Sequence, residues 1–166
     1  MGIFSKTLKA AYVTTVLAVA TAAAPAFAAG TTIEVQLWDK GASTEMMTNM
    51  GKAMMGPDTK MAPMGITVSA NSASAGEITF AVTNTSTEVI HEMVISPLAT
   101  PETVLPYDEK NSKVDEDAAG HLGEVAELDP GASGSLTLTF KPGLYIMYCN
   151  IPGHFASGMW TLFTVK

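Results

Sequence analysis

The sequence predicts an all-β fold, a Greek-key β-sandwich of about seven or eight strands. Short runs of residues alternate between apolar and polar, and Gly, Pro, Asn and Asp separate these runs. The 166 residues, 47% of them hydrophobic, suffice for one globular domain. Nine basic residues against 16 acidic ones give a formal net charge of −7. Because nucleic acids are held by basic clusters, nucleic-acid binding is excluded.

The first 28 residues have the features of an export signal. Lys6 and Lys9 precede an apolar stretch over residues 10–24, and Ala26-Phe27-Ala28 places small residues where a signal peptidase cleaves. The stretch is shorter than the roughly 20 residues that cross a bilayer. We therefore expect cleavage after Ala28 and an exported, periplasmic protein without stable membrane insertion.

The expected strands follow one another along the mature chain. Alternating apolar residues predict half-buried strands at 33–37, 66–68, 78–82 and 136–140. More continuous apolar runs predict central strands at 89–96, 143–149 and 159–165. Residues 97–123 contain three prolines and an acidic stretch, which predicts a long, solvated surface connection.

A methionine-rich segment interrupts this pattern near the N-terminus. Its members include Met46, Met47, Met50, Met54 and Met55. Three of them recur at helical spacing, so one interpretation is a short helix or strap that packs on the sandwich. The other is a surface that contacts Cu(I), because thioethers are soft ligands suited to that ion.

The residues with the most specific chemistry lie on one short loop. Cys149, His154 and Met159 place a thiol, an imidazole and a thioether between two predicted strands. Cys149 is the only cysteine, so it forms no internal disulfide. His91 lies in an apolar strand far upstream, where a histidine alone would be read as a core residue. The loop motif makes it the candidate for a fourth donor.

A set of two His, one Cys and one Met favours copper over other metals. A trigonal His₂Cys plane with a weak axial thioether suits copper that cycles between Cu(I) and Cu(II), whereas zinc prefers Cys and His donors alone. Nucleophilic catalysis is the competing use of Cys and His. It requires an exposed, electropositive thiolate, but Cys149 follows an aromatic strand in an acidic protein.

These motifs resemble the blue copper proteins, or cupredoxins. The resemblance is carried by Gly143-x-Tyr145 leading to Cys149, by the Cys-x4-His-x4-Met spacing, and by His91 after Asn84-Thr85. Within the family, the loop spacing is most similar to that of rusticyanins and sulfocyanins. The resemblance covers a copper-binding core (65–166). Together with the export signal, it divides the rest of the chain into a signal peptide (1–28) and an N-terminal strand with the methionine-rich segment (29–64).

The resemblance implies a site and a function. His91, Cys149 and His154 would be equatorial ligands and Met159 the axial ligand of one copper ion per chain. The protein would be a monomeric one-electron carrier and not an enzyme, with a redox partner such as a c-type cytochrome or a terminal oxidase. In the family the second histidine acts as the electron port, and the apolar residues around His154 would form the docking surface: Ile151, Pro152, Phe155 and Ala156. The alternative is a copper chaperone or copper-resistance protein that captures Cu(I) with the methionine-rich segment.

One residue departs from the family pattern. Several cupredoxins have Asn after the first histidine ligand, but this chain has Glu92. A carboxylate cannot donate the hydrogen bonds that an amide does. Since neighbouring residues in a strand point to opposite faces, we expect the Glu92 side chain to point away from His91 and to leave the ligand set intact.

Overall fold

The computed structural model describes Gly2, residues 30–41 and residues 62–166. The predicted signal peptide, apart from Gly2, lies outside the described residues. So do the methionines proposed to contact Cu(I), namely Met46, Met47, Met50, Met54 and Met55. In the part of the chain that the structure describes, no helix is long and apolar enough to cross a bilayer.

One sheet has four strands in the order β2-β1-β4-β9. These are β1 (Thr31–Asp39), β2 (Met64–Val68), β4 (Gly76–Asn84) and β9 (Ser133–Phe140). In β1 and β4 every second residue is buried, as the alternating sequence predicts. Strand β1 pairs in parallel with β4 and antiparallel with β2, so the sandwich includes the strand that precedes the methionine-rich segment.

The second sheet has the order β3-β11-β10-β5-β8. Its strands are β3 (Ser72–Ala73), β5 (His91–Leu98), β8 (Gly123–Leu128), β10 (Gly143–Tyr148) and β11 (Trp160–Val165). The three runs expected to be central strands are β5, β10 and β11, and each has a neighbour on both sides. The nearly continuous apolar sequences of β5 and β10 are explained by burial on both faces. In β11 only Phe163 and Val165 are buried.

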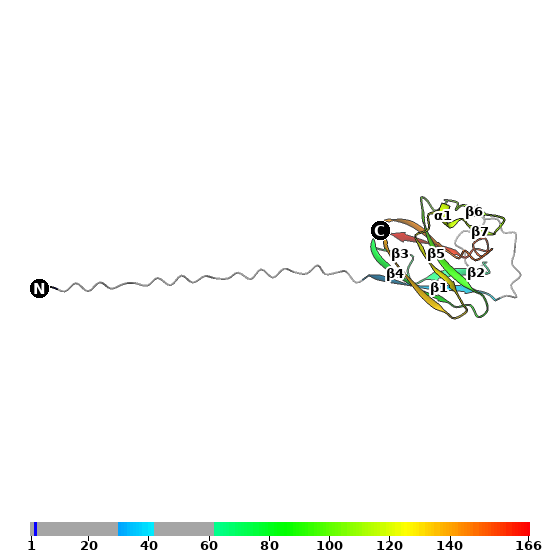
Figure 1. Cartoon of the computed structure of the whole chain (residues 1–166), viewed down its shortest axis with the longest axis horizontal. Helices are drawn as coiled ribbons and strands as arrows, with labels where there is room; N and C mark the ends of the chain where they lie inside the picture. The colour runs from blue at the N-terminus through cyan, green and yellow to red at the C-terminus, as the bar shows by residue number, and fades with distance from the viewer. Residues whose placement is uncertain (1, 3–29, 42–61) are drawn as a thin grey trace.

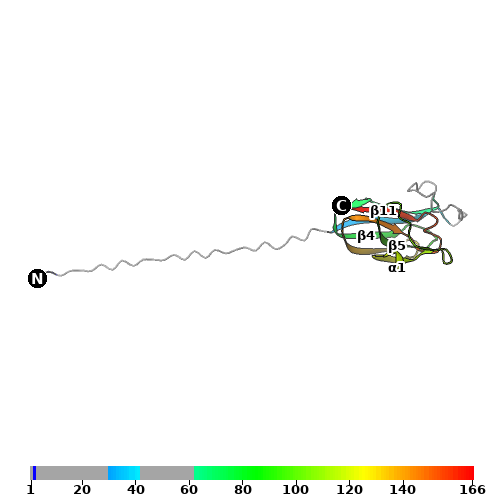
Figure 2. The ribbon, with the colours of Figure 1, turned by 90° about the horizontal axis from the view of Figure 1, so that it is seen from above.

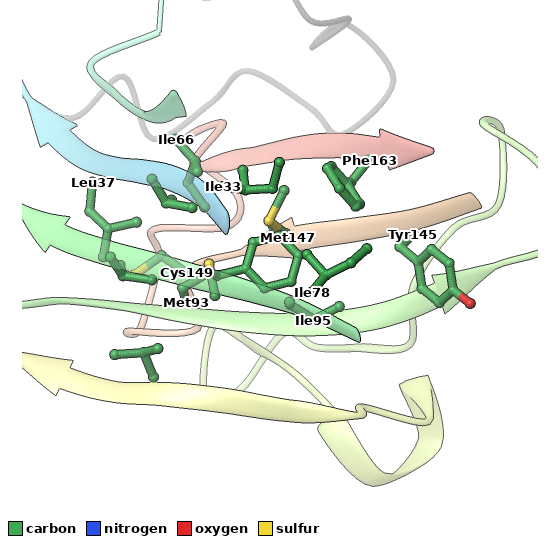
Figure 3. Close-up of a cluster of buried hydrophobic side chains, with 14 of the residues drawn as sticks. Ile33, Leu37, Ile66, Ile78, Met93, Ile95, Tyr145, Met147, Cys149 and Phe163 are labelled. Atoms are coloured by element: carbon green, nitrogen blue, oxygen red, sulfur yellow. The ribbon is translucent and has the colours of Figure 1, made fainter. Parts of the chain in front are cut away.

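The two sheets pack face to face around one main core (Figure 1). Figure 3 shows Cys149 close to Met93 and Leu37 at one end of this cluster, with Tyr145 at the other end. In the described residues, eight strands have five or more residues, and the prediction of an all-β sandwich is confirmed. The start of β1 and the C-terminus lie at the same end of the sandwich (Figures 1 and 2).

The prediction for residues 97–123 was wrong in part. This connection contains a small hairpin of β6 (Tyr107–Asp108) and β7 (Lys113–Val114), and a single helical turn, α1 (Glu116–Ala119), next to β5 (Figure 2). Leu105 and Val114 are buried in a second apolar cluster that covers the outer face of β5 and β10. A sequence rich in Pro and acids still supplies apolar side chains at the few positions that meet the sheet.

Candidate metal centre

The loop that joins β10 to β11 is held in a fixed shape by its own backbone. The Met159 amide donates to the His154 carbonyl (3.1 Å), and the Cys149 amide donates to the Met159 carbonyl (3.0 Å). Gly153 and Gly158 have φ angles of 84° and 92°, which a residue with a Cβ adopts only under strain. The loop thereby returns the chain on itself, and the three donor residues are all buried: Cys149, His154 and Met159.

His91 lies next to the three buried residues of this loop because of its position in the neighbouring strand, β5. It is the first residue of β5, which runs antiparallel to β10, so it lies beside the end of β10 where Cys149 follows. Its Nδ1 atom is 3.2 Å from His154 Nδ1 and 4.0 Å from Cys149 Sγ. Cys149 Sγ is 3.3 Å from His154 Nδ1. The structure thus brings together three residues that are separated by up to 63 positions.

These three donors fit a metal ion. One ligand atom from each of His91, Cys149 and His154 lies within 4.8 Å of the others, and all three residues are buried. Among residues 30–41 and 62–166, no other group of three or more His, Cys, Asp or Glu side chains has this geometry. Thiolate and imidazole donors with a buried thioether nearby form the donor set that copper prefers.

Burial keeps both imidazoles neutral, which leaves ring nitrogens free to bind a metal. The pKa of His154 is lowered to about 4 by burial and then by the like charge of His91. Burial also lowers the pKa of His91, although Asp39 opposes the shift. Burial raises the pKa of the Cys149 thiol to about 12, and the hydrogen bonds from the Glu92 and Ile151 amides offset this only in part. In the absence of a metal the cysteine is therefore a neutral thiol at pH 7.

Comparison with known proteins identifies the fold. No protein-family model matches the sequence, and no curated protein matches it. Rusticyanin from Thiobacillus ferrooxidans is similar in structure, with a TM-score of 0.51 and 19% identity over 83% of this chain and 79% of that one. Auracyanin B has a TM-score of 0.51 and 21% identity over 82% of this chain and 88% of that one. The fold of the described chain is the cupredoxin fold.

At one end of that fold lie His91, Cys149, His154 and Met159, which make up the donor set of a type 1 copper site. The resemblance inferred from the loop spacing is confirmed in the fold and in the donor set. The structure shows Met159 fully buried and hydrogen-bonded through its backbone to both other loop ligands. The cofactor expected from the sequence, copper, agrees with this donor set.

Because the cysteine must lose its proton to bind, copper loading is expected to release protons. With the thiol pKa near 12 and the His154 pKa near 4, loading at pH 7 displaces about one proton per chain. The apparent Cu(I) affinity should then rise about tenfold per pH unit between pH 6 and 8. Competition with a Cu(I) chelator across this range measures the slope. An affinity that does not change with pH would show that Cys149 does not bind as the thiolate.

Sequence reasoning missed two polar residues that hold the ligands. Asn150 is buried and joins the ligand loop to β7, since its amide group donates to the Val114 carbonyl and its Oδ1 accepts from the Val114 amide. Asp39, at the end of β1, contacts the outer ring nitrogen of His91 at 3.1 Å. The sequence signal for Asn150 is its place directly after the cysteine, but nothing in the sequence around Asp39 indicates a link to residue 91.

Glu92 contacts the site through its backbone. Its amide donates to Cys149 Sγ at 3.4 Å, a bond that stabilises a thiolate. Its side chain is buried, and Oε1 makes no hydrogen bond. The charged groups that act on this carboxyl are Lys113 and three glutamates. They belong to β7, α1 and β8, which agrees with a side chain that points away from His91.

The buried carboxyl of Glu92 makes stability depend on pH. Burial raises its pKa to about 7, so the folded protein binds this proton more tightly than the unfolded chain does. Stability is therefore lost as the pH rises from about 4.5 to about 7. The free energy of unfolding of Glu92→Gln should therefore rise relative to that of the parent as the pH increases across this window, by on the order of 2 kcal/mol. Urea unfolding of the metal-free proteins at several pH values measures the change, with Glu102→Gln, at an exposed position, as control.

The apolar residues predicted to surround His154 lie on the ligand loop. Pro152 is exposed, while Ile151, Phe155 and Ala156 are partly exposed. Phe155 also contacts Tyr107 and Tyr148, with ring centroids 5.9 and 5.7 Å apart, and so fixes the loop on the second cluster. His154 itself is 7% exposed. A small part of this residue therefore reaches the surface.

Proposed function

We propose that the protein is an exported one-electron carrier of the blue copper type. The observation that carries the proposal is the convergence of His91, Cys149 and His154 in a buried cluster, with Met159 on the same loop. Bound copper supplies one-electron redox chemistry at a donor set that suits both Cu(I) and Cu(II). A carrier needs no more than one such centre, since it transforms no substrate.

The chain's own residues serve this role by holding the donor side chains in fixed positions away from solvent. The backbone hydrogen bonds of the loop, the Asn150 bonds to Val114 and the packing of Phe155 all restrict movement of the ligands. Little rearrangement between two oxidation states is what makes electron exchange fast. The chain has three histidines, and two are assigned to this site, so too few imidazoles remain for the second metal centre of a copper oxidase or reductase.

The site would exchange electrons through His154 with a redox protein such as a c-type cytochrome or a terminal oxidase. Ile151, Pro152, Phe155 and Ala156 supply an apolar rim suited to brief contact, since small interfaces separate quickly. The acidic chain would attract a basic partner, in a way that salt weakens.

The test is spectroscopic first and kinetic second. The mature protein loaded with Cu(II) should show an intense visible charge-transfer band that bleaches on reduction, together with narrow copper hyperfine splitting. Electron transfer to a basic c-type cytochrome should slow as ionic strength rises. A colourless protein with an ordinary Cu(II) spectrum would contradict the proposal.

A second function is favoured by the methionines of the sequence. A copper chaperone or resistance protein would capture Cu(I) with Met46, Met47, Met50, Met54 and Met55. Met64, at the end of that segment, is buried in the core and so serves packing. The five methionines should therefore be replaced by leucine while Met64 is kept. Lost Cu(I) binding beyond one ion per chain, with unchanged electron-transfer rates, would support this second function.

A further inference from the structure

Asp39 lies against the ligand His91 from the opposite sheet. Its Oδ2 atom is 3.1 Å from His91 Nε2, and its side chain is 6% exposed while that of His91 is fully buried. A carboxylate only accepts hydrogen bonds, so the Nε2–H of His91 must be the donor. The pair joins the end of β1 to the start of β5 across 52 positions of sequence.

This hydrogen bond selects one form of the His91 ring. A neutral imidazole carries one proton, and placing it on Nε2 leaves a lone pair on Nδ1. Nδ1 is the atom that faces Cys149 Sγ and His154 Nδ1, at 4.0 and 3.2 Å. The carboxylate thus presents the correct nitrogen to the metal position and holds the ring in its plane.

Asp39 is itself held in place on both of its oxygens. The Gly41 amide donates to Oδ1 at 2.7 Å. Burial alone would raise the pKa of Asp39. Hydrogen bonds with Ser86, Gly41 and His91 outweigh this effect and hold the pKa below its usual value, so the carboxyl group is ionised at neutral pH. Ser86 is in turn fixed by accepting from the Glu88 and Val89 amides. A chain of hydrogen bonds therefore connects the loop before β5 to the ligand.

We propose that Asp39 is a positioning residue of the copper site, which orients His91 and lowers the reduction potential. The inference rests on the proposed function, because its second effect requires a copper couple. A carboxylate on the outer nitrogen of a ligand histidine makes the imidazole a stronger donor, and such partners contribute about 10–100-fold to metal affinity. Its negative charge also favours Cu(II) over Cu(I), because the more highly charged ion gains more from it.

Two substitutions separate orientation from charge. Asp39→Asn keeps an oxygen that accepts from His91 Nε2–H but removes the negative charge. The visible charge-transfer band of the copper-loaded protein should therefore remain, and its midpoint potential should rise. The expected change is about tenfold in the preference for Cu(II), which equals about 59 mV for one electron. Asp39→Ala removes the acceptor as well, and its copper affinity should fall about 10–100-fold. If Asp39→Asn binds copper more tightly than Asp39→Ala does, the hydrogen bond orients the His91 ring.

Glu34→Gln is the matched control, since it removes one negative charge from an exposed position on the same strand. Voltammetry and Cu(I) competition are run on all four proteins. A parent protein without a blue, reversible couple would contradict the proposed function. A blue parent whose Asp39→Asn variant shifts no more than Glu34→Gln would overturn the role of Asp39.

A third measurement needs neither copper nor a folded variant. Nitrogen-15 spectra of the metal-free parent report which ring nitrogen of His91 carries the proton. A proton on Nε2 supports the inference, and a proton on Nδ1 overturns it. Because this readout is independent of the metal, it decides the orienting role even if the variants fail to fold.

Discussion

Replacing Cys149 with serine is expected to abolish the intense visible charge-transfer absorption of the copper-loaded protein. The band requires a thiolate bound to Cu(II), and the serine hydroxyl cannot provide one. Cys149 is fully buried and lies within 3.3 Å of His154 Nδ1. Copper affinity should fall by more than about 100-fold. Residues that only hydrogen-bond to a metal ligand already contribute about 10–100-fold to metal affinity, and a ligand itself should contribute more. Absorption spectroscopy and Cu(I) competition measure the two losses.

Met147→Leu is the control for this substitution. Met147 lies in β10, two residues before Cys149, and is equally buried, but it is not one of the proposed copper ligands. A volume-conserving change there should cost less than about 1.5 kcal/mol and leave the band in place. If Cys149→Ser retained an intense band, the thiolate would not be its source and the assigned site would be wrong.

Replacing Phe80 with alanine is expected to cause the largest loss of stability, about 3–5 kcal/mol. Phe80 is fully buried in β4, and its ring meets those of Phe140 and Phe163 at centroid distances of 5.8 and 5.4 Å. These rings come from β9 and β11, so the contact joins the two sheets. The cavity left by the deletion cannot be filled by neighbours that belong to paired strands. Urea unfolding of the parent and variant measures the difference.

Phe80→Leu keeps most of the buried volume and should cost only about 1–2 kcal/mol. Phe80 pairs with Ile33, which is six residues before Asp39 on β1, about 20 Å along the strand, so the copper spectrum of folded Phe80→Ala should be that of the parent. A loss below about 1 kcal/mol for the alanine variant would show that this cluster does not hold the sheets together.

Several strands could be predicted because their signal is local. In β1, buried Ile33, Val35 and Leu37 alternate with exposed residues, and a period of two is the direct result of strand geometry. Strand β8 was missed because Val125 is its one buried residue, as suits a strand at the edge of the sheet. The burial of Leu105 and Val114 was missed for a similar reason: it depends on contacts with distant strands.

The sequence by itself determined the sandwich class, the ligand loop and the preference for copper. The first two depend on residues that are neighbours in the chain: the alternation within each strand, and the thiol, imidazole and thioether spaced over residues 149–159. The preference for copper depends on this loop together with His91, which the loop motif made the candidate for a fourth donor. Only the tertiary structure decided what lies around them. Asp39 and His91 are 52 positions apart and belong to different sheets, and Asn150 bonds to a hairpin 36 positions upstream. Such contacts arise from the packing and register of whole strands, which no short stretch of sequence encodes.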